Sequence, residues 1–434
     1  MGTPLLISLP ARLLGVVLAL GTCPALAAVQ GAQAPLSQQA CDGLRRAVQA
    51  DQRGDGSSPL LLASYRTGGE AVAAPPMDRA LDGVAFTYDN ALAGIALLAC
   101  GQTASARRIA DALVLASTSD AYYRDGRVRN AYKAGPLPDA KPTLPGYWSA
   151  ERNQWIADAY QLSSANGNVA WAALLLLNLQ QASPDARYLA AATRLLGWVE
   201  QQTRATVDPD GYQGGWYGWD GAQRAQTWKS TEHNIDIAMA AAWAARLTGS
   251  QAQLRQSRTA LAFVSRMWSA DERRFFIGTE ADGASIVTRG SGLDAQLWPI
   301  LAMPPGRCAW RAGLAWVERH HRFGEGYGFK DAPDGIWTEG SAQMAATLLA
   351  AKGSVPESLW RLLAAQRTDN GLYLATPSQR ISTGLAIGPD SKGSDFYYYR
   401  WPHLGATAWI ALAATGWNPF TGKANATGAT PCPS

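Results

Sequence analysis

Six runs of small and apolar residues, each preceded by a polar turn, constrain the fold of this 434-residue chain most strongly. Each run is long enough for a buried helix, and its many alanines allow close packing. The turns and their runs are 87–90 before ALAGIALLA, 167–168 before VAWAALLLL, 230–234 before IDIAMAAAWAA, 291–294 before AQLWPILA, 337–340 before SAQMAATLLAA and 403–405 before ATAWIALAA. Their starts lie about 45 to 80 residues apart, which is too irregular for a solenoid but fits helical hairpins with variable loops.

A second set of stretches carries charge on one face and apolar residues at helical spacing on the other. These stretches are 37–52, 104–117, 185–203, 250–268, 310–321 and 354–366. We therefore expect an all-α chain in which six inner and six outer helices form an (α/α)6 barrel of six hairpins over residues 37–420. The first outer helix would close the ring against the last inner one, and residues 421–434 would form a loosely ordered tail.

The first 27 residues have the pattern of a signal peptide. Arg12 precedes the apolar run 13–20, and Ala25 and Ala27 fit the A-x-A cleavage pattern. Beyond this segment, no stretch of about 18 apolar residues predicts a membrane span. We expect a periplasmic or secreted protein.

Export would leave four cysteines in an oxidising compartment, where disulfides persist. We favour the pairs Cys41–Cys100 and Cys308–Cys432 among the three possible connectivities. The cysteines and the four histidines have no spacing typical of a metal site, so we expect no metal and no cofactor.

Four of the six inner helices carry a carboxylate in the first turn, namely Asp89, Glu232, Asp294 and Glu339. Parallel inner helices would bring these acids to one rim. A first-turn acid also caps a helix and stabilises its dipole, and Asp294 fits a capping box with Ser291. One turn after Glu232, Asp236 is expected to be a buried structural partner for a cation or a backbone donor.

Aromatic residues crowd the loops that would surround this rim. The chain has 17 Trp and 15 Tyr against 8 Phe, so aromatics with a polar edge predominate. Such rings in Gly-rich loops suit stacking against sugars, with amides and imidazoles meeting the hydroxyls. The predicted substrate-binding residues are Tyr88, Trp148, Asn168, Trp216, Tyr217, Trp228, His233, Asn234, Trp337, Tyr398 and Trp401.

Several other functions are disfavoured. The 38 Lys and Arg against 34 Asp and Glu form no basic cluster, which argues against nucleic-acid binding. The chain also lacks a Walker loop, a G-x-S-x-G elbow and an H-E-x-x-H motif. The Asp208-Pro-Asp-Gly turn could bind calcium, but we interpret it as an ordinary solvated turn.

The phrases TYDNALAGIAL, STEHNID, WTEGSAQMA and ATAWIALAATGWNPF resemble bacterial secreted members of the six-hairpin glycosidase superfamily. The resemblance extends over about residues 88–420. It implies an (α/α)6 barrel that acts on a polysaccharide, often an exopolysaccharide. The superfamily includes hydrolases, lyases and epimerases, and the Ser-Asp-Gly-Asp turn of its cellulase-like members is missing here.

Our first hypothesis is a glycoside hydrolase that inverts configuration, with Glu232 or Glu339 as the acid and Asp89 as the base. Glycosidic cleavage needs one protonated and one ionised carboxyl group. A lyase or epimerase on the same barrel is the alternative, with His233, His403, Tyr88 and Arg400 as candidate groups. A non-catalytic glycan-binding protein would keep the aromatic rings without needing the acids.

Overall fold

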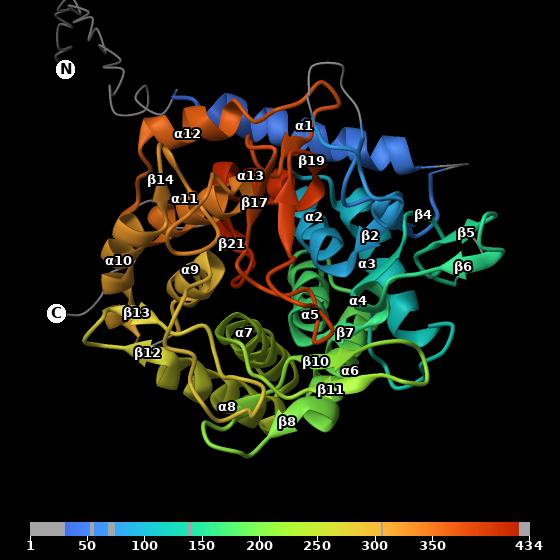
Figure 1. Ribbon diagram of the computed structural model, residues 1–434, viewed down its shortest axis with the longest axis horizontal. Coiled ribbons are helices and arrows are strands. Elements are labelled where there is room, and N and C mark those ends of the chain that lie inside the picture. The colour runs from blue at the N-terminus through green and yellow to red at the C-terminus, as the bar shows by residue number, and fades with distance from the viewer. Residues whose placement is uncertain (1–30, 53–55, 68–73, 138–140, 305–306, 425–434) are drawn as a thin grey trace, which may run out of the picture.

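The computed structural model describes residues 31–424 except 53–55, 68–73, 138–140 and 305–306, and its helices form a double ring (Figure 1). The inner helices are α2 (Thr87–Ala99), α5 (Asn166–Ala182), α7 (Thr231–Thr248), α9 (Leu293–Ala302), α11 (Thr338–Lys352) and α13 (Leu404–Thr415). Each contacts the next, and α13 returns to α2. All six inner helices and the closed ring were predicted correctly.

Each inner helix packs against one outer helix of its own hairpin. The outer helices are α3 (Thr103–Thr118), α6 (Ala186–Thr203), α8 (Gln251–Met267), α10 (Gly313–His320), α12 (Glu357–Ala364) and α1 (Gln33–Asp51). The last of these packs against α13, so the start of the chain completes the final hairpin. The short helices are α4 (Ala159–Leu162), η2 (Arg79–Leu81) and η3 (Cys308–Ala312). The (α/α)6 barrel is confirmed.

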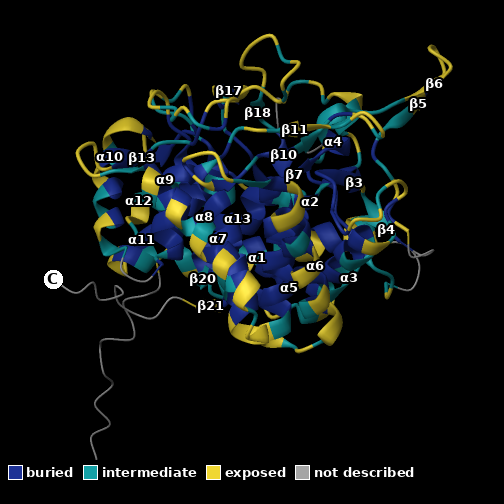
Figure 2. Ribbon diagram, turned by 90° about the horizontal axis from the view of Figure 1, so that it is seen from below, coloured by how far each residue is buried: buried dark blue, intermediate teal, exposed yellow. Residues whose placement is uncertain are grey.

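The two rings differ in burial as the sequence pattern requires. In α13, every residue from Leu404 to Ala414 is buried, whereas α8 buries one face, at positions that include Ala260, Phe263 and Val264. Figure 2 shows buried inner helices and a partly exposed outer layer. The inner ring is thus the core of the molecule.

The strands are short and mostly lie in the loops that precede the inner helices, at one end of the barrel (Figure 2). The antiparallel pairs are β1 (Leu60–Leu61) with β4 (Gly135–Pro136), β2 (Val84–Phe86) with β3 (Ala131–Lys133), β5 (Tyr147–Ser149) with β6 (Gln154–Ile156), β8 (Arg204–Ala205) with β9 (Gly211–Tyr212), β12 (Trp268–Ser269) with β13 (Arg274–Phe275), β14 (Arg322–Phe323) with β15 (Gly326–Tyr327), β16 (Tyr373–Leu374) with β19 (Pro402–His403), β17 (Arg380–Ser382) with β18 (Tyr397–Tyr399), and β20 (Trp417–Asn418) with β21 (Lys423–Ala424). A three-stranded sheet has the order β11 (Arg224–Gln226), β10 (Gly215–Tyr217), β7 (Ser164–Ala165).

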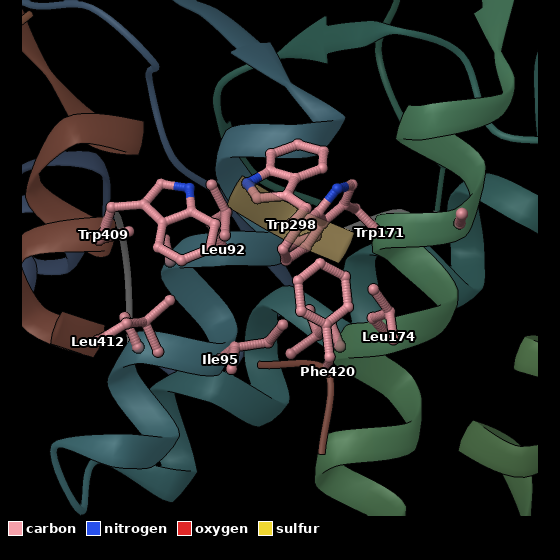
Figure 3. Close-up of a cluster of buried hydrophobic side chains, with 14 of the residues drawn as sticks. Leu92, Ile95, Trp171, Leu174, Trp298, Trp409, Leu412 and Phe420 are labelled. Carbon is pink, nitrogen blue, oxygen red and sulfur yellow. The ribbon is translucent and has the colours of Figure 1, made fainter. Parts of the chain in front are cut away.

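Large aromatic side chains fill the middle of the barrel (Figure 3). The rings of Trp171 and Trp298 have centroids 5.2 Å apart, and Trp409 lies 5.9 Å from Trp171. Below them, Phe420 lies 5.3 Å from Trp171 and is 1% exposed. The chain segment after α13 therefore fills the bottom of the barrel.

That segment corrects the predicted boundary of the tail. Residues 423–424 pair with 417–418 as β21 and β20, so the ordered chain extends beyond Phe420. The side chain of Asn178 donates to the carbonyl of Pro419, and that of Asn418 donates to the carbonyl of Leu301. These bonds fix the segment to α5 and α9. Residues 425–434 lie outside the described part of the chain.

The predicted disulfide Cys41–Cys100 is present and joins α1 to the C-terminal end of α2. The second predicted pair involves Cys432, and the predicted signal peptide covers residues 1–27; both lie outside the described residues. Among the helices of the described chain, none is both long and apolar enough to cross a membrane.

Candidate active site

A cavity of about 450 Å³ opens where the inner helices begin. Asp89 of α2, Glu232 of α7, Asp294 of α9 and Glu339 of α11 all line it, each from the first turn of its helix. The structure thus brings the four predicted acids together. Their roles in catalysis stay predictions.

One side of the cavity is a hydrogen-bonded group around His403. Its Nε2 lies 3.3 Å from Oδ2 of Asp89, and its Nδ1 lies 3.7 Å from Oε2 of Glu339. Tyr88 donates its hydroxyl to Oε1 of Glu339 at 2.7 Å and accepts from the indole of Trp409 at 2.9 Å. Two carboxyl groups and one imidazole are therefore held in fixed positions on the floor of the cavity.

The electrostatics of this group follow from burial and proximity. Burial raises the pKa of Glu339 to about 7, against the lowering effect of His403. Burial opposes the charged form of His403, but Asp89 and then Glu339 outweigh it and raise the pKa of the imidazole. Glu339 can therefore gain or lose a proton near neutral pH.

A glycine in the first turn of α13 makes room for this arrangement. A Cβ atom on Gly405 would lie 2.6 Å from Oδ1 of Asp89 and 3.0 Å from Oε2 of Glu339. Both carboxyl groups thus converge on the position where any other residue would place its side chain.

The other side of the cavity is a cluster of three carboxyl groups. Glu232 and Asp236 lie one turn apart on α7, and Asp294 approaches them from α9. Burial, and then the charge of Asp294, raise the pKa of Glu232 and of Asp236 well above their ordinary values. The Glu232 side chain stays 28% exposed. Glu232 can therefore reach a ligand, and its raised pKa favours the protonated form of the carboxyl group.

His233 lies beside this cluster, with Nε2 3.4 Å from Oε1 of Glu232. Burial lowers the pKa of His233 to about 4, so the ring is neutral near pH 7. A Cβ atom on Gly167 of α5 would lie 2.8 Å from its Nε2. Glycine in the first turn of α5 makes space here too.

Two structural interpretations of the acids are corrected by the structure. The N-cap of α9 is Gly292, and the Ser291 hydroxyl instead contacts Gln296 and His321, so no capping box forms with Asp294. Asp236 is 0% exposed and lines the cavity, but neither of its oxygens has a hydrogen-bond partner among the described residues. It is not the paired structural carboxylate that we expected.

Six of the predicted substrate-binding residues line the cavity: Tyr88, Asn168, His233, Trp337, Tyr398 and Trp401. Their rings form one wall, since Trp337 lies 5.4 Å from Tyr398 and 4.9 Å from Phe329 between centroids. Asn168 donates to Oδ1 of Asn130 at 2.7 Å. The wall combines apolar ring faces with polar groups, as pockets for small ligands typically do.

The remaining five predicted contacts lie outside the cavity lining: Trp148, Trp216, Tyr217, Trp228 and Asn234. Trp148 faces Trp155 across the projecting β5–β6 hairpin and is 52% exposed. Asn234 is buried and bonds both backbone groups of Tyr212. These two bonds hold the backbone of Tyr212, whose side chain is fully buried.

Several residues of the lining were not predicted from the sequence. Tyr65, Tyr160, Trp298 and Phe329 contribute rings, and the segment 383–396, here called the mouth loop, contributes Leu385, Ile387, Asp395 and Phe396. In Figure 1 this loop runs between β17 and β18 across the ring toward β10 and β11. There Asp390 contacts Arg224, and Gly388 packs against Tyr217. The loop has no periodic pattern that could have revealed its position.

No protein-family model and no curated protein sequence matches the chain. Solved structures do match in fold. They include a sugar epimerase from a ruminal bacterium, with a TM-score of 0.59 and 12% identity over 88% of this chain and 99% of that one. A glycosidase in complex with glucose has a TM-score of 0.57 and 14% identity over 88% and 96% of the two chains.

A further match is a GH76 α-mannanase from Bacteroides thetaiotaomicron, with a TM-score of 0.52 and 14% identity over 87% of this chain and 95% of that one. These neighbours are (α/α)6 barrels of the six-hairpin glycosidase superfamily. The chain therefore has the fold of that superfamily, whose members among these neighbours include both glycosidases and epimerases.

Proposed function

We propose that this protein is a glycoside hydrolase that inverts configuration, with Glu232 as the proton donor and Asp89 as the base. The observation that supports it most is the shared cavity, in which a carboxyl group with a strongly raised pKa and one paired with His403 stand on different helices. Cleavage requires one carboxyl group that donates a proton and a second that acts as a base.

The placement of the two acids favours inversion. Asp89 is on α2 and Glu232 on α7, with α5 between them in the ring. Neighbouring helices pack about 8–10 Å apart, so acids on second neighbours have room for a water molecule between them and the sugar. Glu339, with its pKa of about 7, is the second candidate for the donor.

An epimerase remains the second candidate function. Tyr88, His233 and His403 line the cavity and could exchange a proton with a sugar carbon. A lyase that acts on a uronate would need a cation for the sugar carboxylate. None of the described Lys or Arg residues lines the cavity, and Arg400 is not among its lining.

Products formed from a panel of bacterial exopolysaccharides and plant glucans in ¹⁸O-labelled water would test the proposal. A hydrolase places the label on the new reducing end, and NMR of the first product shows the inverted anomer. An epimerase run in deuterated water instead adds deuterium to carbon and leaves the glycosidic bond intact.

Variants then test the two roles. Glu232→Gln and Asp89→Asn should each lower kcat by about 10² or more while substrate affinity is largely retained, because each group acts in the transition state. Trp337→Ala should instead weaken binding, since its ring would support ground state and transition state alike. Near-normal turnover in both acid variants would contradict the proposed mechanism.

We also propose that the protein acts outside the cytoplasm, in the periplasm or as a secreted enzyme. The predicted signal peptide and the Cys41–Cys100 disulfide support this placement. Fractionation of the producing cells, with detection of the cleaved N-terminus near residue 28, tests it.

A further inference from the structure

The cavity differs in charge from the rest of the molecule. Eight carboxyl groups line it, together with two histidines and, among the described residues, no Lys or Arg. The whole chain nevertheless has 38 Lys and Arg against 34 Asp and Glu. A protein with a net excess of cations has thus concentrated carboxyl groups in one pocket.

Most of these carboxyl groups have protein partners. At the rim, Asp78, Asp158 and Asp395 accept from the backbone N–H groups of residues 80, 161 and 387 at 2.7 to 2.9 Å. On the floor, the imidazole of His403 contacts Asp89, and the hydroxyl of Tyr88 donates a hydrogen bond to Glu339. These contacts stabilise the five carboxyl groups, so no bound ligand is needed to explain their positions.

Asp236 is different. It is 0% exposed, lines the floor, and has no hydrogen-bond partner on either oxygen within the described chain. The indole N–H of Trp171 lies close enough to lower the pKa of Asp236. It does not reach the distance and angle of a normal hydrogen bond, and it has no other hydrogen-bond partner in the described chain. Two more carboxyl groups, Glu232 and Asp294, lie close enough to interact with it electrostatically.

A buried carboxyl group without a partner is costly unless it is protonated or meets a cation. Among the described residues, no three His, Cys, Asp or Glu side chains are placed to hold a metal ion. The aromatic wall fits an organic ring. A cation carried on a sugar satisfies both conditions.

We propose that the sugar unit reaching the floor of the cavity is an amino sugar, whose ammonium group pairs with Asp236. The inference rests on the proposed action on a glycan, and it specifies that the bound sugar unit carries a positive charge. It also excludes uronates, sulfated sugars and phosphorylated sugars from this position, because their anionic groups would face carboxyl groups without a compensating cation.

Three pairs of sugars that differ only at C2 test the charge directly: glucosamine with glucose, galactosamine with galactose, and mannosamine with mannose. Affinity is measured by NMR titration just below neutral pH, where the amine is charged. At least one amino sugar should bind about tenfold more tightly than its neutral partner, because a hydrogen bond from the charged ammonium group to Asp236 is stronger than one from a neutral hydroxyl group. If no amino sugar is preferred, the proposal is overturned.

Proton release is a second readout. Because burial raises the pKa of Asp236 and of Glu232, an ammonium group that pairs with Asp236 should lower the pKa of its carboxyl group and release protons on binding. Calorimetry of the preferred amino sugar in two buffers of different ionisation enthalpy should show release, and the neutral partner should show none. Equal proton exchange for both sugars would contradict the pairing.

Asp236→Asn should remove the preference for the amino sugar while the affinity for the neutral sugar changes little. The matched control is Asp271→Asn, an exposed aspartate in the turn between β12 and β13, which should retain the preference. A variant with unchanged melting temperature that still prefers the amino sugar would refute the role of Asp236.

These binding measurements require no turnover. A failure of the hydrolase mechanism would therefore leave the comparison of sugars intact, whereas hydrolysis without any preference for charge would overturn this inference alone.

Discussion

At the scale of single residues, the site depends on glycines as much as on acids. Gly405 and Gly167 each occupy the first turn of an inner helix, and each leaves space for a polar side chain of the cavity. Asp89 and Glu339 can be recognised as candidate site residues from the sequence, because they carry chemistry, whereas Gly405 cannot. These two carboxyl groups can converge only because residue 405 has no side chain.

Gly405→Ala should lower kcat/KM by about 10² or more, because the new Cβ would displace Asp89 or Glu339, and a shift of about 1 Å in a catalytic group can have this effect. Gly197→Ala on α6 is the matched control, since a Cβ there meets nothing within 4 Å. That control should keep full activity and gain up to about 1 kcal/mol of stability. Equal activity in the two variants would show that the packing around Gly405 is unimportant.

Glu339 predicts a pH-dependent stability. Its folded pKa of about 7 exceeds the ordinary value of 4.5, so the folded protein holds a proton that the unfolded chain releases. This contribution to stability is complete below about pH 4.5 and is lost as the pH rises through about 7, by roughly 3 kcal/mol.

Glu339→Gln mimics the protonated form, so its melting temperature relative to the native protein should rise between those pH values and then level off. Denaturation curves at a series of pH values measure the difference. A difference that is constant with pH would contradict the raised pKa.

At the scale of helices and loops, the elements that depend on a local sequence pattern could be predicted, whereas those that depend on long-range contacts could not. The inner helices could be predicted because Ala-rich, fully apolar runs such as 404–414 bury every face. The loops could not, because their rings are placed by partners far along the chain. Trp216 lies in β10 between β7 and β11, and Tyr212 is fixed by Asn234.

The candidate site divides in the same way. The four acids were found because they occupy equivalent first turns, a pattern visible in the sequence. The unpaired state of Asp236 and the path of the mouth loop depend on which groups happen to lie nearby in space. Neither leaves a periodic signal.

The disulfide between α1 and α2 should be important for stability and not for chemistry. It closes a loop with a sequence separation of 59, for which chain entropy predicts about 4 kcal/mol. Cys41→Ser with Cys100→Ser should therefore lower the melting temperature markedly. Turnover at low temperature should be unchanged, because Cys100 is the C-cap of α2 while Asp89 lies at its other end.

At the scale of the whole molecule, the ring is closed twice. The helix α1 completes it in the plane, and the segment 417–424 fills its bottom. Phe420 is the ring that packs between Trp171 and Trp298 from below (Figure 3). The two ends of the described chain therefore both contribute to one core.

Phe420→Ala should lower the free energy of unfolding by about 3–5 kcal/mol, because it removes a fully buried ring and leaves a cavity under the tryptophans. Phe323→Ala is the matched control, since Phe323 is 43% exposed in β14, and it should change stability by less than about 0.5 kcal/mol. Chemical denaturation measures both. A small effect at Phe420 would mean that the segment only rests on the barrel.

Because side chains fill the bottom of the barrel, the cavity is closed at that end. Phe420 and the tryptophans block passage through the barrel, while the mouth loop reaches over the other end. In the described part of the chain, a ligand therefore cannot pass out through the bottom of the barrel, and a product at the mouth would block the next substrate. Under the proposed function, a glycan would reach the floor beside Asp236 with its terminus and would not be threaded through the barrel.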